Sequence, residues 1–276
     1  MNTIKKYLKI LLNSTKLVFN LTNLTKEEMA GHFSLKTKIR LFPKTTIRLP
    51  FHLGRTIRGC SFTDNLDQDP FSKMVSQVLH SKKNDKAIEI LTEFYKEETS
   101  NTHVSPMGPL EPKIFSSYPS WAIVMPWEKI SLKDKLTNYP KLFKKNRSSF
   151  GFDLKEDFSF NSFYSHEAAC SQVEQTRGLL NSIKNRGIIE TKELPLVFIL
   201  KNKSEWRWCM TGEGNHRAYI YALLKEYSML AEVYDLVDRE KVESWPNVLN
   251  GNYTINEALP VFDAFFEGKK SLRGMA

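Results

Sequence analysis

Residues 165 to 239 alternate segments of helical and β-strand pattern in one order, and that order constrains the fold more than any other feature of the chain. Apolar residues recur at helical spacing over 167–186, and Gly187 follows where a helix C-cap glycine is expected. A buried strand is predicted in LPLVFILKN, with EWRWCMTG as its hairpin partner. Helical spacing returns in RAYIYALLKEYS, and a further strand is predicted in LAEVYDLVD. The order helix, strand, strand, turn, helix, strand indicates an α/β (α+β) domain.

The turn between the second predicted strand and the second helix is GEGNHR, Gly212–Arg217. A glycine-bounded turn that enters a helix exposes backbone N–H groups at the positive end of the helix dipole, where anions such as phosphate bind. We therefore expect Gly212, Gly214 and Asn215 to belong to a phosphate-binding turn. The alternative is a tight turn with only a capping role.

Three side chains of this turn add chemistry to the backbone. Arg217 can contact phosphate oxygens with two N–H groups, and His216 can donate a hydrogen bond or shuttle a proton. Glu213 would repel a phosphate unless a metal ion lies between them or the carboxylate handles a proton or a hydroxyl donor. Its presence favours catalysis or Mg²⁺ binding over passive capture of an anion.

The N-terminal half, 31–149, has a different pattern and resembles no family. Polar and apolar residues alternate in short runs over 34–63, which predicts a small β element. Residues 69–98 carry two helical blocks separated by HSKKND. Five prolines over 105–127 indicate a linker or an ordered wrapping arm and not a helix. We place a domain boundary near this linker, with the C-terminal domain at 150–276.

Composition limits the partners and the compartment. The formal net charge of +9 favours anionic partners. Cys60, Cys170 and Cys209 are odd in number, widely spaced and without a CxxC motif, so neither a disulfide framework nor a zinc site is indicated, and a reducing cytoplasm fits best.

No run reaches the roughly 18 to 20 apolar residues that span a bilayer. Residues 1–30 predict a basic amphipathic helix, either packed on a domain or attached to an anionic inner-membrane surface.

The run of segments from 165 to 239 resembles the core of the ParB/sulfiredoxin superfamily, in which a Gly-x-x-Arg turn precedes a helix and a final strand. Sulfiredoxins carry a catalytic cysteine directly before His-Arg; Asn215 stands there in this chain, which argues against sulfinic-acid reduction. ParB proper binds CTP and continues into a helix-turn-helix DNA reader. The 40 or so residues after the core are too few and too aromatic for that reader, which disfavours centromere-type DNA binding.

The closest pattern is that of the ParB-like free serine kinases. Their Asp-Gly-His-His-Arg turn aligns with Glu213–Arg217, where Glu replaces Asp and Asn replaces the first His. Those kinases also carry a His-Glu pair ahead of the first helix, and His166 and Glu167 stand at a similar separation from the turn. The substitutions mean that the substrate does not transfer with the resemblance.

The resemblance implies a role for each matched position. Glu167 would deprotonate an acceptor hydroxyl, and Glu213 would contact the acceptor or a Mg²⁺ ion. The backbone of Gly214, with His216 and Arg217, would hold the phosphates of ATP, ADP or CTP. Phosphoryl transfer needs positioning and charge neutralisation more than covalent work by the protein, so these groups are adequate for it.

The function expected from the sequence is therefore a nucleotide- and Mg²⁺-dependent phosphotransferase that acts on a hydroxyl of a small molecule or a glycan precursor. The alternative is a nucleotide- or nucleic-acid-binding regulator without phosphotransfer. Glu174 is a second candidate for the base, although spacing of three to Arg177 also fits a surface ion pair. Glu167 also fits a first-turn acidic residue favoured by the helix dipole.

Overall fold

The structure, a computed structural model, describes residues 45–99, 107, 110–118, 122–137, 166–188 and 194–268. The amphipathic helix expected at 1–30 and the first part of the β element expected at 34–63 lie outside these ranges. None of the described helices is both long enough and apolar enough to cross a membrane.

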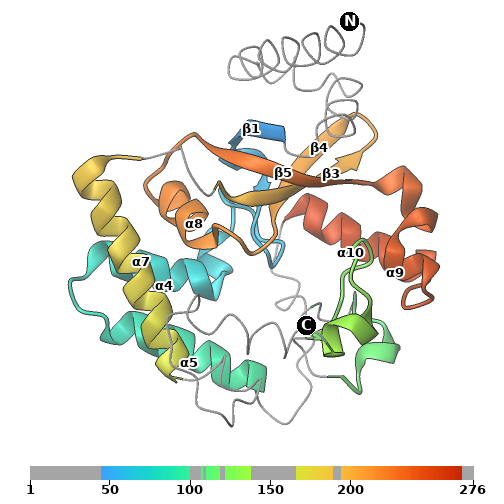
Figure 1. Cartoon of the computed structure of the whole chain (residues 1–276), viewed down its shortest axis with the longest axis horizontal. Coiled ribbons are helices and arrows are strands. Elements are labelled where there is room, and N and C mark those ends of the chain that lie inside the picture. Colours follow the sequence, from blue (N-terminus) through green and yellow to red (C-terminus); the bar gives the residue numbers. More distant parts are fainter. Residues whose placement is uncertain are drawn as a thin grey trace, which may run out of the picture.

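A mixed five-stranded sheet forms the middle of the molecule (Figure 1). Its order is β1-β5-β3-β4-β2. The strands are β1 (Thr45–Pro50), β2 (Gly54–Arg55), β3 (Leu196–Asn202), β4 (Glu205–Met210) and β5 (Ser228–Asp238). β3 and β4 form the expected antiparallel hairpin, and β5 returns parallel to β3 on its other side. The predicted order of elements and the α/β class are confirmed.

The sheet joins the two halves of the chain. β1 pairs antiparallel with β5, with Thr45 opposite Val233, and β2 pairs parallel with β4, with Gly54 opposite Trp208. The boundary expected near the linker therefore does not separate two sheets, because strands from both sides of it share their hydrogen bonds.

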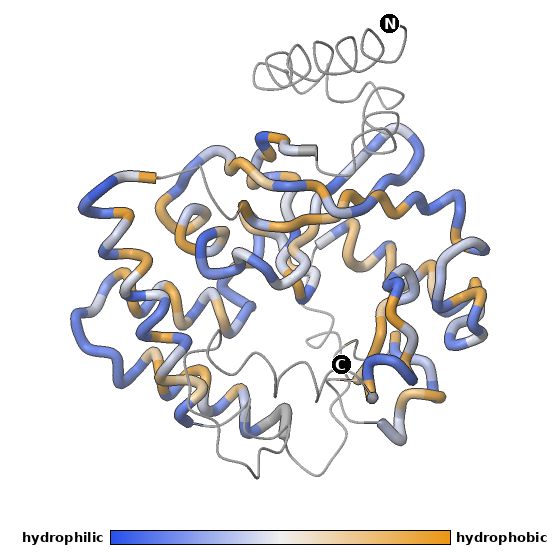
Figure 2. The backbone as a smooth tube through the Cα atoms, in the orientation of Figure 1, coloured by the Kyte–Doolittle hydropathy of each residue, from blue (hydrophilic) through white to orange (hydrophobic). Residues whose placement is uncertain are grey.

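Helices cover both faces of the sheet (Figure 1). One face packs against α4 (Pro70–His80), α5 (Asp85–Thr99), α7 (His166–Arg186) and α8 (Asn215–Leu223). The other packs against η8 (Arg239–Ser244), α9 (Pro246–Leu249), α10 (Ile255–Glu267) and the segment 122–132. Alternation along β3 serves both faces, since Val197 and Ile199 enter the first core and Phe198 and Leu200 contact the second. Figure 2 shows hydrophobic colour along these central strands.

Local sequence explains where the helices begin and end. Asp69 accepts hydrogen bonds from Phe71 N–H and Ser72 N–H and so caps α4, whose first residue is a proline. Thr254 and Glu257 form a capping box at α10. The two helices expected over 69–98 and the helix expected over 167–186 are confirmed as α4, α5 and α7.

The described part of the proline-rich segment, residues 107, 110–118 and 122–127, lies against the second face of the sheet. In its described part, the helical structure is limited to short 3-10 turns such as η4 (Lys113–Phe115). The hydroxyl of Tyr253 donates to the Val124 carbonyl at 2.7 Å, and Phe115 and Trp127 are buried in the core with α10. This is the ordered wrapping arm that the prolines allowed.

Candidate functional site

The GEGNHR turn connects β4 to α8 and depends on two glycines in left-handed backbone conformation. Gly212 has φ 119° and Gly214 has φ 80°. A Cβ atom at Gly214 would lie 2.7 Å from Pro195 Cα, so only glycine fits there without a shift of the backbone. Leu196 N–H donates to the Glu213 carbonyl at 3.3 Å and holds the turn against the start of β3.

The N-terminus of α8 leaves backbone donors available for an anion. Gly214 is its N-cap and supplies no side-chain acceptor for the first-turn N–H groups. Gly212 and Glu213 are exposed, and Arg217 is half-buried on the first turn of the helix. The Asn215 Oδ1 atom is buried and has no hydrogen-bond partner within the described part of the chain. The first-turn amides of α8 and the Arg217 guanidinium are the donors that a phosphate-binding turn requires, and the Asn215 oxygen is an acceptor that does not contribute to phosphate binding.

The side chain of His216 lies between α8 and α7. Its Nδ1 lies 2.7 Å from Thr176 Oγ1 and its Nε2 lies 2.7 Å from Gln172 Oε1, both on α7. The Thr176 hydroxyl has one proton, and its other neighbour is the Gln172 carbonyl at 2.8 Å. Both ring nitrogens of His216 therefore have hydrogen-bond partners on α7 whichever neutral tautomer the ring adopts. Phe71 contacts the ring edge to face at 4.9 Å. Both nitrogens are therefore engaged in holding α8 against α7, which disfavours phosphate binding or proton shuttling by this ring.

Burial lowers the pKa of His216 from 6.5 to about 4, because desolvation disfavours the charged ring. Its neutral form therefore contributes stability that is fully present above pH 6.5 and is lost as the pH falls toward 4. Between pH 7 and pH 5 we expect the wild type to lose about 2 kcal/mol more unfolding free energy than His216→Gln, as measured by urea denaturation. His80→Gln, at the end of α4, is the control and should behave as the wild type. Equal losses in the wild type and His216→Gln would contradict a buried neutral ring.

The two carboxylates expected to act as the base do not face the turn. Thr176, which contacts His216, is nine positions after Glu167, and at about 100° per residue the two lie on opposite sides of α7. Glu174 lies about 160° from Thr176 by the same rule. Both glutamates are exposed. Their place on α7 disfavours either side chain as a base at the turn.

Neighbours of these carboxylates also depart from expectation. His166 Nδ1 lies 3.3 Å from Thr92 Oγ1 on α5, so the His-Glu pair begins α7 beside α5 and not beside the turn. Arg177 Nε donates to Asn84 Oδ1 at 2.7 Å in the connection between α4 and α5. The Arg177 guanidinium therefore joins α7 to the connection between α4 and α5.

Glu213 is the remaining candidate for metal binding. Among the described residues, no group of three or more His, Cys, Asp or Glu side chains is arranged to hold a metal ion. Mg²⁺ commonly binds through one or two carboxylates together with phosphate oxygens and water. A single exposed carboxylate at the entrance to α8 is compatible with that mode, in which the protein supplies only one or two of the metal ligands.

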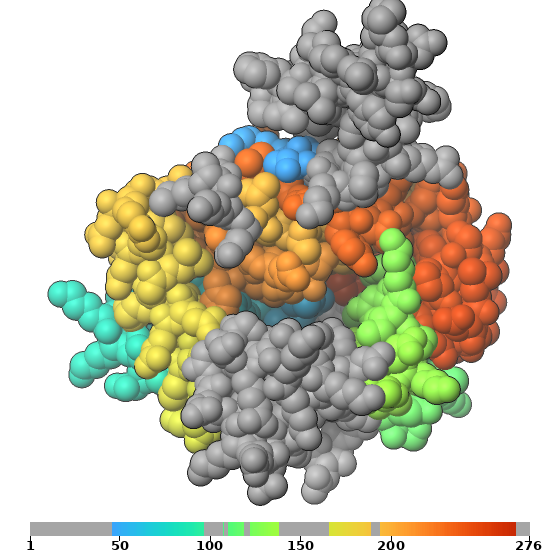
Figure 3. All heavy atoms as spheres, viewed as in Figure 1, coloured from blue at the N-terminus to red at the C-terminus, as the bar shows by residue number. Residues whose placement is uncertain are grey.

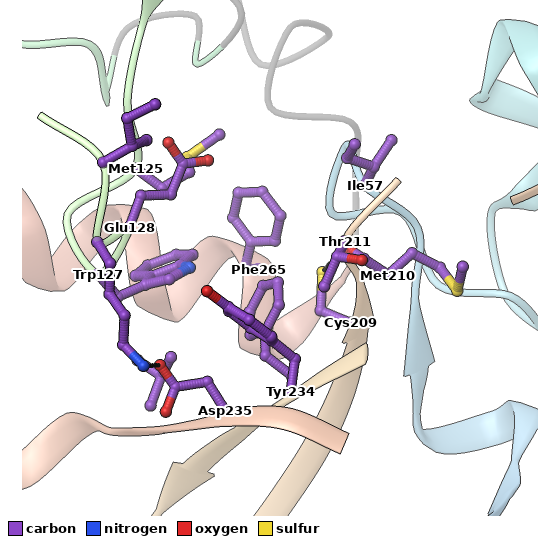
Figure 4. Close-up of a pocket in the computed structure, with 14 residues that line it drawn as sticks. Ile57, Met125, Trp127, Glu128, Cys209, Met210, Thr211, Tyr234, Asp235 and Phe265 are labelled. Carbon is purple, nitrogen blue, oxygen red and sulfur yellow. Dashed lines mark hydrogen bonds and ion pairs between the residues drawn. The ribbon is translucent and has the colours of Figure 1, made fainter. Parts of the chain in front are cut away.

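A cavity of about 310 Å³ begins where the turn begins. Thr211, the residue before Gly212, lines it, and so does Ile57, whose Cδ1 would be 3.7 Å from a Cβ at Gly212. Figure 3 shows the surface hollowed between the orange part of the chain and the green segment 122–132. The other lining residues come from 125–130, β3, β4, β5 and α10 (Figure 4). Sequence reasoning missed this cavity because its walls are far apart in the chain and share no motif.

No family model matches the chain, and comparisons with curated proteins and with solved structures also return no match. The resemblance of residues 165–239 to the ParB/sulfiredoxin superfamily stays a prediction from sequence. What the chain can bind follows from the geometry of the turn and the cavity.

Proposed function

We propose that the chain binds a nucleotide, with its phosphates at the N-terminus of α8. The observation that carries the proposal is the backbone at Gly214: its left-handed conformation turns the chain into α8 and leaves the first-turn N–H groups without a cap side chain. Arg217 on that first turn adds a guanidinium, and the net charge of +9 favours an anionic ligand. The unpartnered Asn215 Oδ1 would accept a hydrogen bond from a ribose hydroxyl.

Binding without transfer is the version that the side chains support best. Glu167 and Glu174 lie on the far side of α7 from the His216 contact, and both ring nitrogens of His216 are occupied. A phosphotransferase needs a group within about 3 Å of the proton that it removes. In this conformation the turn carries backbone N–H groups and a guanidinium that can bind phosphate, whereas the glutamates expected to remove a proton lie on the far side of α7.

Phosphotransfer to a small-molecule or glycan hydroxyl is the second candidate, and Glu213 favours it. This carboxylate is exposed and directly precedes Gly214. With a nucleotide bound, it could share a Mg²⁺ ion with phosphate oxygens, and the metal would neutralise charge on the transferred group. Mg²⁺-dependent product formation that is lost in Glu213→Gln would select this candidate over binding alone.

Titration calorimetry with ATP, ADP and CTP, with and without Mg²⁺, tests the proposal. We expect at least one nucleotide to bind, and Arg217→Ala to weaken it about 10- to 100-fold, since a charge-assisted hydrogen bond contributes about 1.5–3 kcal/mol. The matched control is Arg186→Ala in the last turn of α7, where the exposed guanidinium donates to Ser182 at 2.7 Å. Thermal unfolding of both variants checks that the fold is retained.

Two outcomes would contradict nucleotide binding at the turn. One is the absence of binding by all three nucleotides, and the other is equal affinity for the wild type and a folded Arg217→Ala. A nucleic-acid regulator is distinguished by salt, because its affinity falls steeply with added salt through the release of counterions.

A further inference from the structure

The cavity on the α10 side of the sheet has aromatic walls. Trp127, Phe198, Tyr234 and Phe265 line it (Figure 4). The centroid of the Trp127 ring lies 6.0 Å from that of the Phe198 ring and 5.5 Å from that of the Phe265 ring. The planes of the Trp127 and Phe265 rings are 89° apart. Flat rings around a space of about 310 Å³ favour a flat guest, because aromatic pairs gain from stacked and edge-to-face contacts beyond the area that they bury.

An unused donor points into this space. Trp127 is 7% exposed, and its indole N–H makes no hydrogen bond with any residue that the structure describes. Figure 4 shows the indole nitrogen turned toward the space between Phe265 and Tyr234. By contrast, the indole N–H of Trp208 donates to the Pro50 carbonyl at 2.7 Å and that of Trp245 to the Asp238 carbonyl at 3.2 Å. The Trp127 nitrogen is not among the buried side-chain atoms that lack a partner in the described part of the chain, so it is open to the cavity and can donate to a group that enters it.

An unused acceptor lines the same cavity. The Glu128 side chain lines the cavity and is 35% exposed; its Oε2 atom is buried and forms an ion pair with Lys135 Nζ at 3.6 Å, which leaves the rest of the carboxylate accessible. The ammonium of Lys135 instead donates to the Ile123 carbonyl at 2.6 Å. The carboxylate therefore retains the capacity to accept a hydrogen bond from a group inside the cavity.

The segment that carries both groups is fixed before any ligand arrives. The side-chain amide of the buried Asn247 donates to the carbonyls of Met125 and Glu128, each at 2.9 Å. Lys129 Nζ is 2.8 Å from Asp235 Oδ2 across the cavity wall, and the hydrogen bond to Asp235 raises the pKa of Lys129. A wall held in this way loses little conformational entropy when a ligand binds.

We propose that this cavity binds a flat heteroaromatic ring of nucleobase size that carries an exocyclic amino group, as adenine and cytosine do. The ring stacks among the aromatic side chains, a ring nitrogen accepts from the Trp127 indole N–H, and the amino group donates to Glu128. The cavity alone carries this inference, which holds for a nucleoside without phosphate. If a nucleotide binds at the turn, the cavity beside Thr211 receives its base, and that extension rests on the function proposed above.

Nucleosides without phosphate test the cavity separately from the turn. Adenosine and cytidine are titrated into ¹⁵N-labelled full-length protein, and inosine and uridine serve as matched rings without the amino group. We expect an amino-bearing nucleoside to bind at least about tenfold more tightly than its partner. The indole N–H resonance that disappears in Trp127→Phe should shift on binding in the wild type.

Variants then separate recognition from stability. Trp127→Phe keeps an aromatic wall and removes the donor, so we expect affinity to fall about tenfold, and Glu128→Gln should reduce the preference for the amino group. Trp208→Phe is the control, because its indole N–H is bonded to the Pro50 carbonyl and its ring lies in the core on the other face of the sheet. It should bind as the wild type does, and thermal unfolding confirms that all three variants are folded.

The outcomes also separate this inference from nucleotide binding at the turn. No nucleoside binding at millimolar concentration, unchanged affinity in a folded Trp127→Phe, or no shift of the wild-type Trp127 indole resonance on binding would overturn the cavity proposal. If ATP, ADP or CTP still bound and their affinity depended on Arg217, nucleotide binding at the turn would be retained and the cavity proposal rejected. If nucleosides bound through Trp127 while Arg217→Ala had no effect on ATP or CTP, only the cavity proposal would survive.

Discussion

Replacing Arg55 with methionine is expected to lower the free energy of unfolding by about 3–5 kcal/mol, the largest effect that we predict. Arg55 is 4% exposed, and burial is the main reason that its pKa falls to about 10. Its guanidinium donates to the carbonyls of Phe265, Phe266 and Glu267 at the end of α10, and to the Gly54 carbonyl at 2.8 Å. Methionine fills similar volume but leaves these carbonyls without that donor, and each unsatisfied buried group costs about 1–3 kcal/mol.

Urea denaturation of matched variants isolates the cause. Arg55→Lys keeps the charge but cannot reach several carbonyls with a fixed fork, so it should recover only part of the loss. Arg186→Met changes the same residue type on an exposed helix end and should alter stability by no more than about 0.5 kcal/mol. If the Arg55 and Arg186 variants unfold alike, the buried guanidinium does not hold α10.

Arg55 bonds to Phe265, 210 positions further along the chain, and contacts of this kind cannot be predicted from the local sequence. Helices and hairpins can. Periodicity and caps act over a few residues, and they predicted α4, α5, α7 and the β3–β4 hairpin. The pairing of β2 with β4 joins Gly54 to Trp208 across more than 150 positions, and no local pattern encodes such a contact. A two-residue strand also carries too little alternation to be recognised. The domain boundary expected near 105–127 was inferred from local composition and stays a prediction.

In the candidate site, too, some features can be predicted from the local sequence and others depend on how the helices pack. The left-handed Gly214 and the start of α8 could be inferred, because glycine followed by a helical run is a local signal. The orientation of α7 could not, since helical spacing shows which residues share a face and not which neighbour that face meets. Rotation of α7 places Gln172 and Thr176, and not Glu167, against His216. The site residues expected from the resemblance were transferred by their order in the sequence, which does not show which of them lie close together in space.

Gly214→Ala is expected to lower the free energy of unfolding by about 3 kcal/mol and to abolish nucleotide binding at the turn. A left-handed residue with a Cβ costs about 1–2 kcal/mol, and overpacking against Pro195 costs about 1–3 kcal/mol more. Relief of that contact requires the turn to move away from β3, which would redirect the first-turn N–H groups of α8. Differential scanning calorimetry and ATP or CTP titration measure the two effects.

Gly178→Ala provides the control for both measurements. Gly178 lies within α7, and a Cβ there would meet nothing within 4 Å. Alanine in a helix interior is favoured over glycine by about 0.5–1 kcal/mol, so this variant should be slightly more stable and should bind nucleotide normally. Loss of stability with intact nucleotide affinity in Gly214→Ala would separate the turn from the phosphate site. In that case the first-turn amides of α8 could not be the phosphate ligands, since their direction depends on the backbone that the substitution displaces.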